Sequence, residues 1–329
     1  MLVRDPAVAI GPVLLVSAVF VLLSATQDVA TDALAVRLLP TGHRGTGNGI
    51  QVAATYAGAV LGGGVCVLAY DVLGWSAAVL LLAGLTLVAL LQVAAFREPS
   101  RGQRVATAAA WAAPVRVYRS PEVPGWALGV VPLLYCGAAG VNVLTGPALV
   151  DAGWSLARVG FVTGVVVSVP ALVAGVVAGH LVRSHGRARV LVAGGIALLV
   201  STAGLLPLLT GRVDTVGAML ALSGFLVAYT ALNVVVYTVL MDLSRSATSG
   251  TDFTTLTTVP LVLSFVAGSV SLALAERAGY VAPAVLWCVV ALGGVALGVQ
   301  WLRRWSPDGT PGQAGSRTTT AVSSGRRVA

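Results

Sequence analysis

Apolar segments long enough to cross a lipid bilayer recur along the entire chain. The hydrocarbon core of a bilayer is roughly 30 Å thick, and a helix of about 20 apolar residues spans it. Of the 329 residues, 57% are apolar and only 10% are charged, whereas a soluble domain carries about a quarter charged residues. This pattern predicts an all-α polytopic membrane protein. We expect nine spans, over residues 8–38, 47–69, 75–96, 124–149, 156–180, 188–210, 214–242, 251–275 and 279–302.

The linkers between these spans are short except for one, which divides the spans into three and six. Residues 97–123 contain Pro, Gly and several Arg and are expected to form a loop. The tail over residues 304–329 is rich in Ser, Thr, Gly and Arg, and it could bury too little apolar surface to offset the entropy of ordering. We therefore predict that the tail is disordered and that residues 1–96 and 124–303 form two helical groups.

All 20 basic residues are arginine, and their positions indicate topology. With nine spans, sixteen arginines fall on one side of the membrane and four on the other. The positive-inside rule places the larger set in the cytoplasm, so the C-terminus is expected inside and the N-terminus outside, although the N-terminus shows no signal-peptide pattern. The net charge of +8 is spread between apolar runs, and no nucleic-acid partner is expected.

The first span carries a stripe of polar residues near its C-terminal end. Ser24, Asp28 and Asp32 recur every four residues and so lie on one helix face, with Gln27 and Thr31 beside them. A carboxylate within a bilayer costs roughly 3 kcal/mol unless it faces protein or water. The stripe therefore predicts either a lined pathway with a protonatable acid, or carboxylates near the cytoplasmic interface that hold a nearby arginine or loop in place.

Three other spans contain polar side chains at helical spacing, and we expect these also to face the inside of the bundle. Two of the sets open the second and eighth spans, and the third lies within the seventh. The sets are Asn48, Gln51 and Thr55; Thr251, Asp252, Thr255 and Thr258; and Tyr229, Asn233 and Tyr237.

Two segments of the chain are weakly alike at an offset of 205 residues. At this offset Asp28 meets Asn233, and Gly45 meets Gly250. Helix groups repeated in the two halves of a chain are typical of transporters with internal repeats. The sequence therefore suggests, on few matches, that the first and last spans repeat one another.

Pairs of glycines separated by three residues predict close approaches between helices, because glycine lets two backbones come near. We interpret these pairs as packing features. They are Gly58 with Gly62, Gly160 with Gly164, and Gly175 with Gly179.

Residues 24–64, SATQDVATDALAVRLLPTGHRGTGNGIQVAATYAGAVLGGG, resemble the fourth and fifth helices of major facilitator superfamily permeases. Within that superfamily they are similar to the branch of muropeptide permeases, acetyl-CoA transporters and siderophore permeases of the rhizobactin and pyochelin type. The siderophore group is the most similar of these.

A second segment, GHLVRSHGRARV at residues 179–190, resembles the cytoplasmic loop motif of the same superfamily, G-x-L-a-D-R-x-G-R-R. Gly179, Leu181, Gly186 and Arg187 match the motif and are candidate gating-loop residues. Arg183 stands where the motif has Asp, so the usual gating salt bridge is not expected in its ordinary form. The Gly-Pro pair of the antiporter signature is missing from the second span, which favours symport or uniport.

The resemblance implies a partial major facilitator fold, because family members have twelve helices in two halves with both termini cytoplasmic. The match begins at the fourth helix. Residues 1–96 would then be the remnant of the N-terminal half, 97–123 the cytoplasmic loop between halves, 124–303 the C-terminal half and 304–329 a cytoplasmic tail. A late start codon, a truncated gene or a decayed copy would each explain the missing helices, and the chain alone is not expected to transport.

The function implied is transport of a small organic solute across the cytoplasmic (inner) membrane by alternating access, with siderophore uptake coupled to protons as one form. Asp28 is the expected titrating group. We expect a monomer in membrane lipid, with no cofactor and no metal. Candidate residues for substrate binding or coupling are Asp28, Gln27, Asp32, Asn48, Gln51, Tyr135, Asn142, Tyr229, Asn233, Tyr237 and Asp252.

Two other classes of function stay open. A membrane-embedded transferase would need a catalytic cluster, but His180 and His185 have no acidic or cysteine partner nearby in sequence, and no G-x-S-x-G or HExxH motif is present. The three cysteines lie inside apolar segments without metal-ligand spacing. A membrane remnant that acts as a sensor or scaffold without transport is the second alternative.

Overall fold

The computed structural model describes residues 10–97, 113–212 and 214–305, and every regular element within them is a helix. The predicted all-α membrane fold is therefore confirmed. Nine helical segments of the described chain are long and apolar enough to span a membrane. They run over Ile10–Leu38, Thr41–Leu73, Trp75–Ala95, Gly125–Asp151, Leu156–His185, Arg187–Leu209, Thr215–Leu243, Ser246–Ala278 and Val281–Arg304.

Several spans contain more than one helical element. Three of them include a π-helical segment (η2, η3 and η4), a local widening of the helix that is common near functional sites. The elements are α1 (Ile10–Leu38), η1 (Thr41–His43), α2 (Arg44–Ala59), η2 (Val60–Val65), α3 (Cys66–Leu73), α4 (Trp75–Ala95), α6 (Ala113–Val117), η3 (Gly125–Val130), α7 (Val131–Asp151), α8 (Leu156–Phe161), η4 (Val162–Val166), α9 (Ser168–His185), α10 (Arg187–Leu209), α11 (Thr215–Leu243), η5 (Ser246–Thr248), α12 (Ser249–Ala278) and α13 (Val281–Arg304).

Glycine ends three of the spans by allowing a sharp change of direction. Gly74, Gly186 and Gly279 have φ angles of 82°, 84° and 72°, which side chains with a Cβ rarely adopt. Each lies between two long helices that run in opposite directions. These turns need only one or two residues, so the consecutive helices pack as close neighbours.

The helix bounds show the internal repeat more clearly than the sequence did. At the offset of 205 residues, α1 coincides with α11 and η1 with η5. The segment from the start of α2 to the end of α3 coincides with α12, and Gly74 coincides with Gly279. The predicted repeat is thus confirmed. We call residues 10–95 the first unit and residues 215–304 the last unit.

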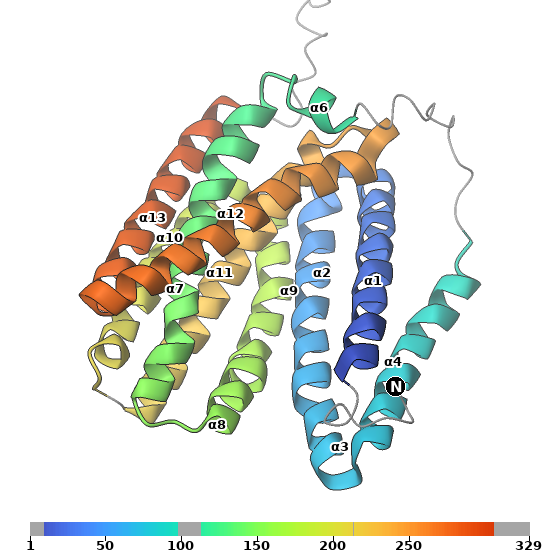
Figure 1. The fold of residues 1–329 in the computed structure, drawn as a ribbon. Helices are drawn as coiled ribbons and strands as arrows, with labels where there is room; N and C mark the ends of the chain where they lie inside the picture. The colour runs from blue at the N-terminus through green and yellow to red at the C-terminus, as the bar shows by residue number, and fades with distance from the viewer. Residues whose placement is uncertain (1–9, 98–112, 213, 306–329) are drawn as a thin grey trace, which may run out of the picture.

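The six spans from α7 to α13 form the body of the molecule (Figure 1). In it α7 packs against α12 and α13, and α10 packs against α11 and α13. The first unit joins this body through α2, which lies against α9 and α11, and through α1, which lies against α12. Helix α4 packs mainly against α3 and lies at the edge of the bundle (Figure 1).

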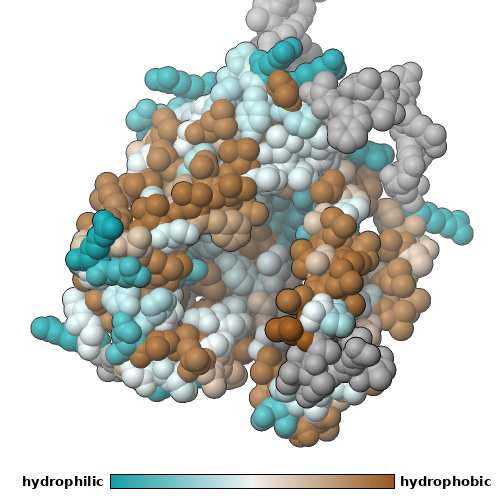
Figure 2. Space-filling view, in the orientation of Figure 1, coloured by the Kyte–Doolittle hydropathy of each residue, from teal (hydrophilic) through white to brown (hydrophobic). Residues whose placement is uncertain are grey.

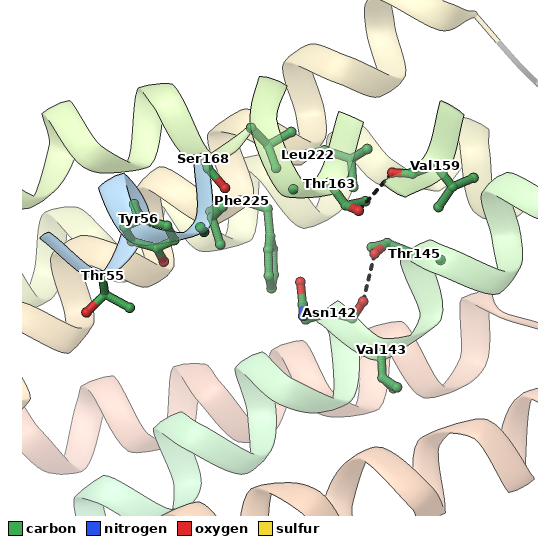
Figure 3. A pocket seen from close by; sticks show the side chains of 15 residues that line it. Thr55, Tyr56, Asn142, Val143, Thr145, Val159, Thr163, Ser168, Leu222 and Phe225 are labelled. Atoms are coloured by element: carbon green, nitrogen blue, oxygen red, sulfur yellow. Dashed lines mark hydrogen bonds between the residues drawn. The ribbon is translucent and has the colours of Figure 1, made fainter. Parts of the chain in front are cut away.

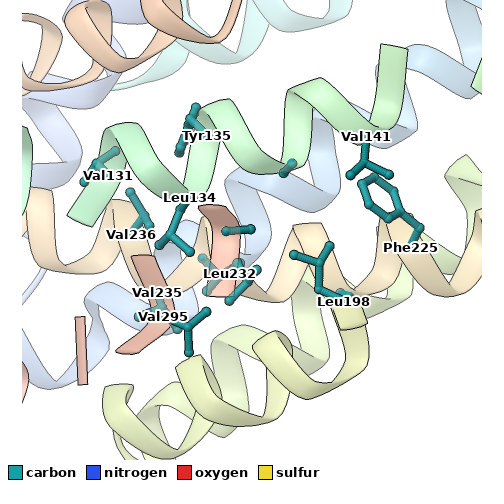
Figure 4. Packing of buried hydrophobic residues seen from close by; sticks show 14 of the residues in the cluster. Val131, Leu134, Tyr135, Val141, Leu198, Phe225, Leu232, Val235, Val236 and Val295 are labelled. Atoms are coloured by element: carbon teal, nitrogen blue, oxygen red, sulfur yellow. The ribbon is translucent and has the colours of Figure 1, made fainter. Parts of the chain in front are cut away.

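The apolar core lies inside the body, between α7, α10, α11 and α13 (Figure 4). Leu134, Leu198, Phe225, Leu232 and Val295 from these four helices are all buried in it. Dispersion between closely packed side chains holds membrane helices together, because lipid is as apolar as the core. The body is therefore the well-packed part of the molecule.

The outer surface carries the apolar side chains that the composition requires. Apolar residues cover much of the face in Figure 2, and hydrophilic residues gather near the helix ends. This face is hollowed between the body and the first unit (Figure 2). A surface of this kind suits acyl chains around the bundle and water at its ends.

The glycine pairs differ from one another. Gly175 and Gly179 lie in close contact with α2, as predicted. Gly58 and Gly62 have no atom within 4 Å of the position that a Cβ would occupy, and the same holds for Gly160 and Gly164 among the described residues. The packing prediction is therefore wrong for those two pairs, because spacing shows which glycines share a face and not whether a helix lies opposite.

Two predicted segments fall largely outside the described residues. Of the predicted loop at 97–123, residues 98–112 are not described, and the short helix α6 lies in the described remainder, where only a loop was expected. The predicted tail over 304–329 lies outside the described residues from 306 onward.

Candidate functional site

A cavity of about 450 Å³ lies between α2 of the first unit and the body. Helices α7, α9 and α11, together with α8 and η4, supply the other walls (Figure 3). The size falls in the range of roughly 300–1,000 Å³ typical of small-molecule pockets. The lining residues are Thr55, Tyr56, Ala59, Asn142, Val143, Thr145, Gly146, Val159, Thr163, Gly164, Val167, Ser168, Leu222, Phe225 and Leu226.

Threonine hydroxyls around the cavity donate to their own helices. Thr55 Oγ1 donates to the carbonyl of Gln51 at 3.2 Å, and Thr163 Oγ1 donates to the carbonyl of Val159 at 2.8 Å. Thr145 Oγ1 likewise donates to a carbonyl of its own helix at 2.7 Å. A hydroxyl has one hydrogen and two acceptor lone pairs. These three hydroxyls therefore present acceptors to the cavity.

A group of aromatic residues lies along α2, α7 and α11 beside the cavity. The Tyr135 and Tyr229 rings meet edge to face with centroids 6.3 Å apart, and Tyr237 packs on Phe253 at 5.9 Å. Tyr56, which lines the cavity, forms a hydrogen bond of 3.0 Å with the hydroxyl of Thr230 on α11. The predicted tyrosines thus gather between the cavity and the arginine-bearing end of the bundle.

The acidic stripe of α1 is placed apart from the cavity lining. Asp32 accepts a hydrogen bond of 2.7 Å from Gln51 Nε2, which links α1 to α2. Asp28 and Gln27 are exposed, one turn farther toward the opposite end of α1. Since a carboxylate is costly in lipid, the position of Asp28 on this exposed face is a feature that any function must explain.

The bundle is closed at the end that bears Arg44, Arg187 and Arg245, which we call the arginine-rich end. Here α2 crosses α9 through four glycines. A Cβ on Gly49 would lie 2.5 Å from the carbonyl oxygen of Gly175 and 2.8 Å from Cα of Gly179. Only glycine allows two backbones to approach this closely, so the crossing leaves no passage between these helices.

Asp242 at the end of α11 forms ion pairs with two arginines at this crossing. Its carboxylate lies 2.9 Å from Arg44 Nη1 and 2.5 Å from Arg187 Nη2, and only 2% of its side chain is exposed. Arg44 belongs to the first unit and Arg187 to the body. A buried carboxylate held by two guanidinium groups is costly to leave without partners, so this arrangement ties the first unit to the body.

Asn48 extends the same contact inward. Its side-chain nitrogen donates to the carbonyl of Arg44 at 3.0 Å, and it lies 3.1 Å from the sulfur of Met241 on α11. The residue is fully buried. Asn48 therefore joins α2 to α11 rather than lining the cavity.

Asp252 lies in a second ion pair at the arginine-rich end. Its carboxylate accepts bonds of 2.7 and 2.8 Å from the Arg245 guanidinium, which also donates to the carbonyl of Ala113. These bonds raise the pKa of the Arg245 guanidinium above its ordinary value, so it stays charged. The pair fastens the start of α12 to α6, which is a structural role.

Of the residues singled out from the sequence, some line the cavity and others bond to other parts of the protein. Asn142 lines the cavity, whereas Asp32, Gln51 and Asn48 are hydrogen-bonded between helices and Asp252 pairs with Arg245 before the start of α12. Of the motif residues, Gly179 lies in the glycine crossing, Gly186 makes the turn between α9 and α10, and Arg187 pairs with Asp242.

Sequence reasoning missed Asp242, Arg44, Phe225 and several cavity hydroxyls. Asp242 carried a usable signal, because it is a lone acid at the end of an apolar span. Thr55 was expected to face the inside of the bundle and lines the cavity. Phe225, Thr145 and Thr163 carried no signal, because such residues are common on helix faces of every kind. Among the described residues, no group of three His, Cys, Asp or Glu side chains could hold a metal ion.

Comparison with known families adds the last finding. The family model described as Major Facilitator Superfamily matches residues 6–259, which is more than half of the 329 residues. The chain therefore belongs to the major facilitator superfamily, whose members transport small solutes across membranes rather than acting as enzymes.

Proposed function

We propose that this member of the major facilitator superfamily moves a small organic solute across the membrane by alternating access, with the cavity as its solute site. The observation that supports this most directly is the placement of the cavity. It lies between the first unit and the body, and the same two parts meet at the glycine crossing and at Asp242. A relative motion of the two parts would open one end and close the other.

The arginine-rich end is the cytoplasmic end in this proposal, and the membrane is the cytoplasmic (inner) membrane. The sixteen-to-four division of arginines supports this orientation, which also places the C-terminus inside. The structure then corresponds to an outward-facing state, with the ion pairs of Asp242 and the glycine crossing as the inner gate. The proposed acting form is the monomer, with residues 1–96 and 124–303 as the two moving parts. Transport by this chain would overturn the expectation, drawn from the resemblance, that the chain alone does not transport.

Proton coupling by Asp28 and a siderophore cargo are the finer parts of the proposal. Asp28 lies one helical turn from Asp32, so two carboxylates share one face of α1. A proton bound by one of them relieves their mutual repulsion. Asp28→Asn should abolish a proton-dependent step, and an unchanged pH profile of solute uptake would rule out this role.

A membrane protein that does not transport, such as a sensor or scaffold, is the second candidate. The exposure of the first unit favours this candidate. In the most apolar stretch of α1 no residue is buried, and in that of α4 only 6% of the residues are buried. Helices this exposed suit a contact with another membrane polypeptide. Solute flux in reconstituted vesicles separates the two candidates, because only the first predicts transport.

Sidedness of thiol labelling tests alternating access without knowledge of the solute. Thr163→Cys places a thiol in the cavity after the native Cys66, Cys136 and Cys288 are replaced by alanine. In sealed vesicles, a membrane-impermeant reagent should label this thiol from the extracellular side. Adding Asp242→Asn should weaken the inner gate and increase labelling from the cytoplasmic side. Labelling from one side only, with and without the second substitution, contradicts the proposal.

A further inference from the structure

We propose that the cavity selects solutes that carry no net charge and that offer hydrogen-bond donors. This inference deepens the proposed transport function and rests on it. The cavity chemistry supports it through three features: the charge of the lining, the direction of its hydrogen bonds and the position of its apolar wall.

The first feature is the charge of the lining. None of the described residues that line the cavity carries a formal charge. Arg158 adjoins the lining residue Val159, but its guanidinium lies over the Trp154 ring and donates to Thr215. Asp32, Arg44 and Asp242 lie outside the lining and are engaged with other protein groups. A charged solute would therefore lose its hydration without gaining a countercharge, which is strongly unfavourable inside a membrane protein.

The second feature is the set of acceptors that three lining threonines present, beside Asn142 and Ser168, which can both donate and accept. The hydroxyls of Thr55, Thr145 and Thr163 use their hydrogens on helix carbonyls. Their free lone pairs can accept hydrogen bonds from the O–H or N–H groups of a solute. The Asn142 carboxamide makes no hydrogen bond within the described residues and projects into the cavity (Figure 3), so it can both donate to a solute and accept from it.

The third feature is the apolar wall. Leu222, Phe225 and Leu226 share one face of α11 by their spacing and line the cavity. Phe225 lies beside Asn142 of α7 (Figure 3). An aromatic ring such as Phe225 binds apolar or ring-shaped groups by stacking and by excluding water. The solute class is therefore a neutral molecule with hydroxyl or amide groups on one side and an aliphatic or cyclic part on the other.

The inference also narrows the siderophore proposal. A ferric chelate whose ligands carry more than three negative charges is an anion, and the cavity lining offers it no cationic partner. A chelate whose three ligand charges cancel those of Fe³⁺ has no net charge and meets the electrostatic requirement. Among siderophore chelates, only the neutral type agrees with this lining.

Charged and neutral thiol reagents of similar size test the inference directly. The reagents are hydroxyethyl, sulfonatoethyl and trimethylammonioethyl methanethiosulfonate, applied to the cysteine-free protein with Thr163→Cys, and separately with Thr55→Cys in case one variant does not fold. The rate of each reagent with the cavity cysteine is divided by its rate with a free thiol in solution. This ratio should be about tenfold larger for the neutral reagent than for either charged reagent. An equal or faster rate for a charged reagent overturns the inference.

Two further variants show that the assay reports local charge. Thr215→Cys lies beside Arg158, whose Nη2 is 3.1 Å from the Thr215 hydroxyl, and next to the Asp214 carboxylate, so adding Arg158→Gln should shift the preference there away from the anionic reagent. Adding Asn142→Asp to Thr163→Cys should shift the preference toward the cationic reagent, and no shift contradicts the role given to Asn142.

Failure of this inference is distinguishable from failure of the proposed function. Labelling from both sides with a preference for a charged reagent retains alternating access and overturns the solute class. Labelling from one side with a preference for the neutral reagent retains the solute class and overturns alternating access. If neither cavity cysteine reacts while Thr215→Cys does, the cavity is closed to solutes and the inference is overturned.

Discussion

The first unit and the last unit follow the same helix plan, yet their first and third spans differ greatly in burial, whereas their second spans, at 22% and 28%, do not. Their helix bounds coincide at an offset of 205 residues. In the most apolar stretch of α1 no residue is buried, whereas 44% of the residues in that of α11 are buried. The buried share is 6% in α4 and 39% in α13. Helix formation is local, whereas burial requires neighbours, and only the last unit has α7 and α10 against it. The comparison therefore shows that local sequence is enough to form these helices, whereas a buried core also requires neighbouring helices.

The two units also differ in the chemistry of one equivalent stripe. At the offset of 205 residues, Asp28 and Asp32 of α1 correspond to Asn233 and Tyr237 of α11. Asn233 is buried, whereas Asp28 is exposed. Neutral polar groups can be buried between helices at modest cost, and carboxylates cannot. The packed unit thus has neutral groups where the exposed unit has acids.

The largest expected effect comes from one pair of equivalent phenylalanines. Phe225 in the last unit is 1% exposed, and Phe20 at the same position of the first unit is 57% exposed. Phe225→Ala should lower the free energy of unfolding by about 4 kcal/mol through loss of buried contacts and creation of a cavity. Phe20→Ala should change it by less than about 0.5 kcal/mol. Unfolding in detergent micelles measures both, and equal losses would break the comparison.

The next effect concerns the two ion pairs of Asp242, one of which, with Arg44, joins the first unit to the last. Asp242→Asn should lower stability by on the order of 3 kcal/mol, because it leaves the guanidinium groups of Arg44 and Arg187 without a counterion. Thermal unfolding checks this value. Limited proteolysis should show the first unit becoming sensitive before the body, and simultaneous cleavage of both would show that the two parts do not separate.

A smaller effect is expected at the glycine crossing. Gly49→Ala would place a Cβ 2.5 Å from the Gly175 carbonyl oxygen, and overpacking of this kind costs about 2 kcal/mol. Gly58→Ala is the matched control on the same helix, since nothing lies within 4 Å of its Cβ position. The control should be neutral or slightly stabilising, because alanine favours helix formation. A similar loss in both variants would mean that helix propensity, and not the crossing, sets the result.

The smallest effect is expected at the equivalent polar positions. Asp28→Asn should change the free energy of unfolding by less than about 0.5 kcal/mol, because the side chain is exposed. Asn233→Asp should be clearly more destabilising, because it buries a carboxylate. If Asp28→Asn is the more damaging change, another part of the protein shields Asp28, and the comparison of the units must be revised.

Much of the fold could be predicted from the sequence, and much less of the site. Apolar length and turn residues located nine spans, with the second beginning at Thr41 instead of residue 47 because η1 and the first turn of α2 are polar. Of the predicted cavity liners, Asn142 lines the cavity, while Asn48 bonds to Met241 on α11 and Gln51 to Asp32 on α1. Helical spacing showed which polar residues share a face, and it could not show what lies opposite that face.

The amino-acid sequence alone determined that the chain is helical and that it belongs in a membrane, and it indicated on few matches the repeat that the helix bounds then showed. Those properties follow from apolar length, local turn chemistry and periodicity, which act within one helix or between neighbours in the chain. The tertiary structure decided that Asp242 meets Arg44 across 198 residues and that Asn142 faces a cavity. Such pairings depend on how whole helices cross one another, and that depends on packing summed over many small contacts.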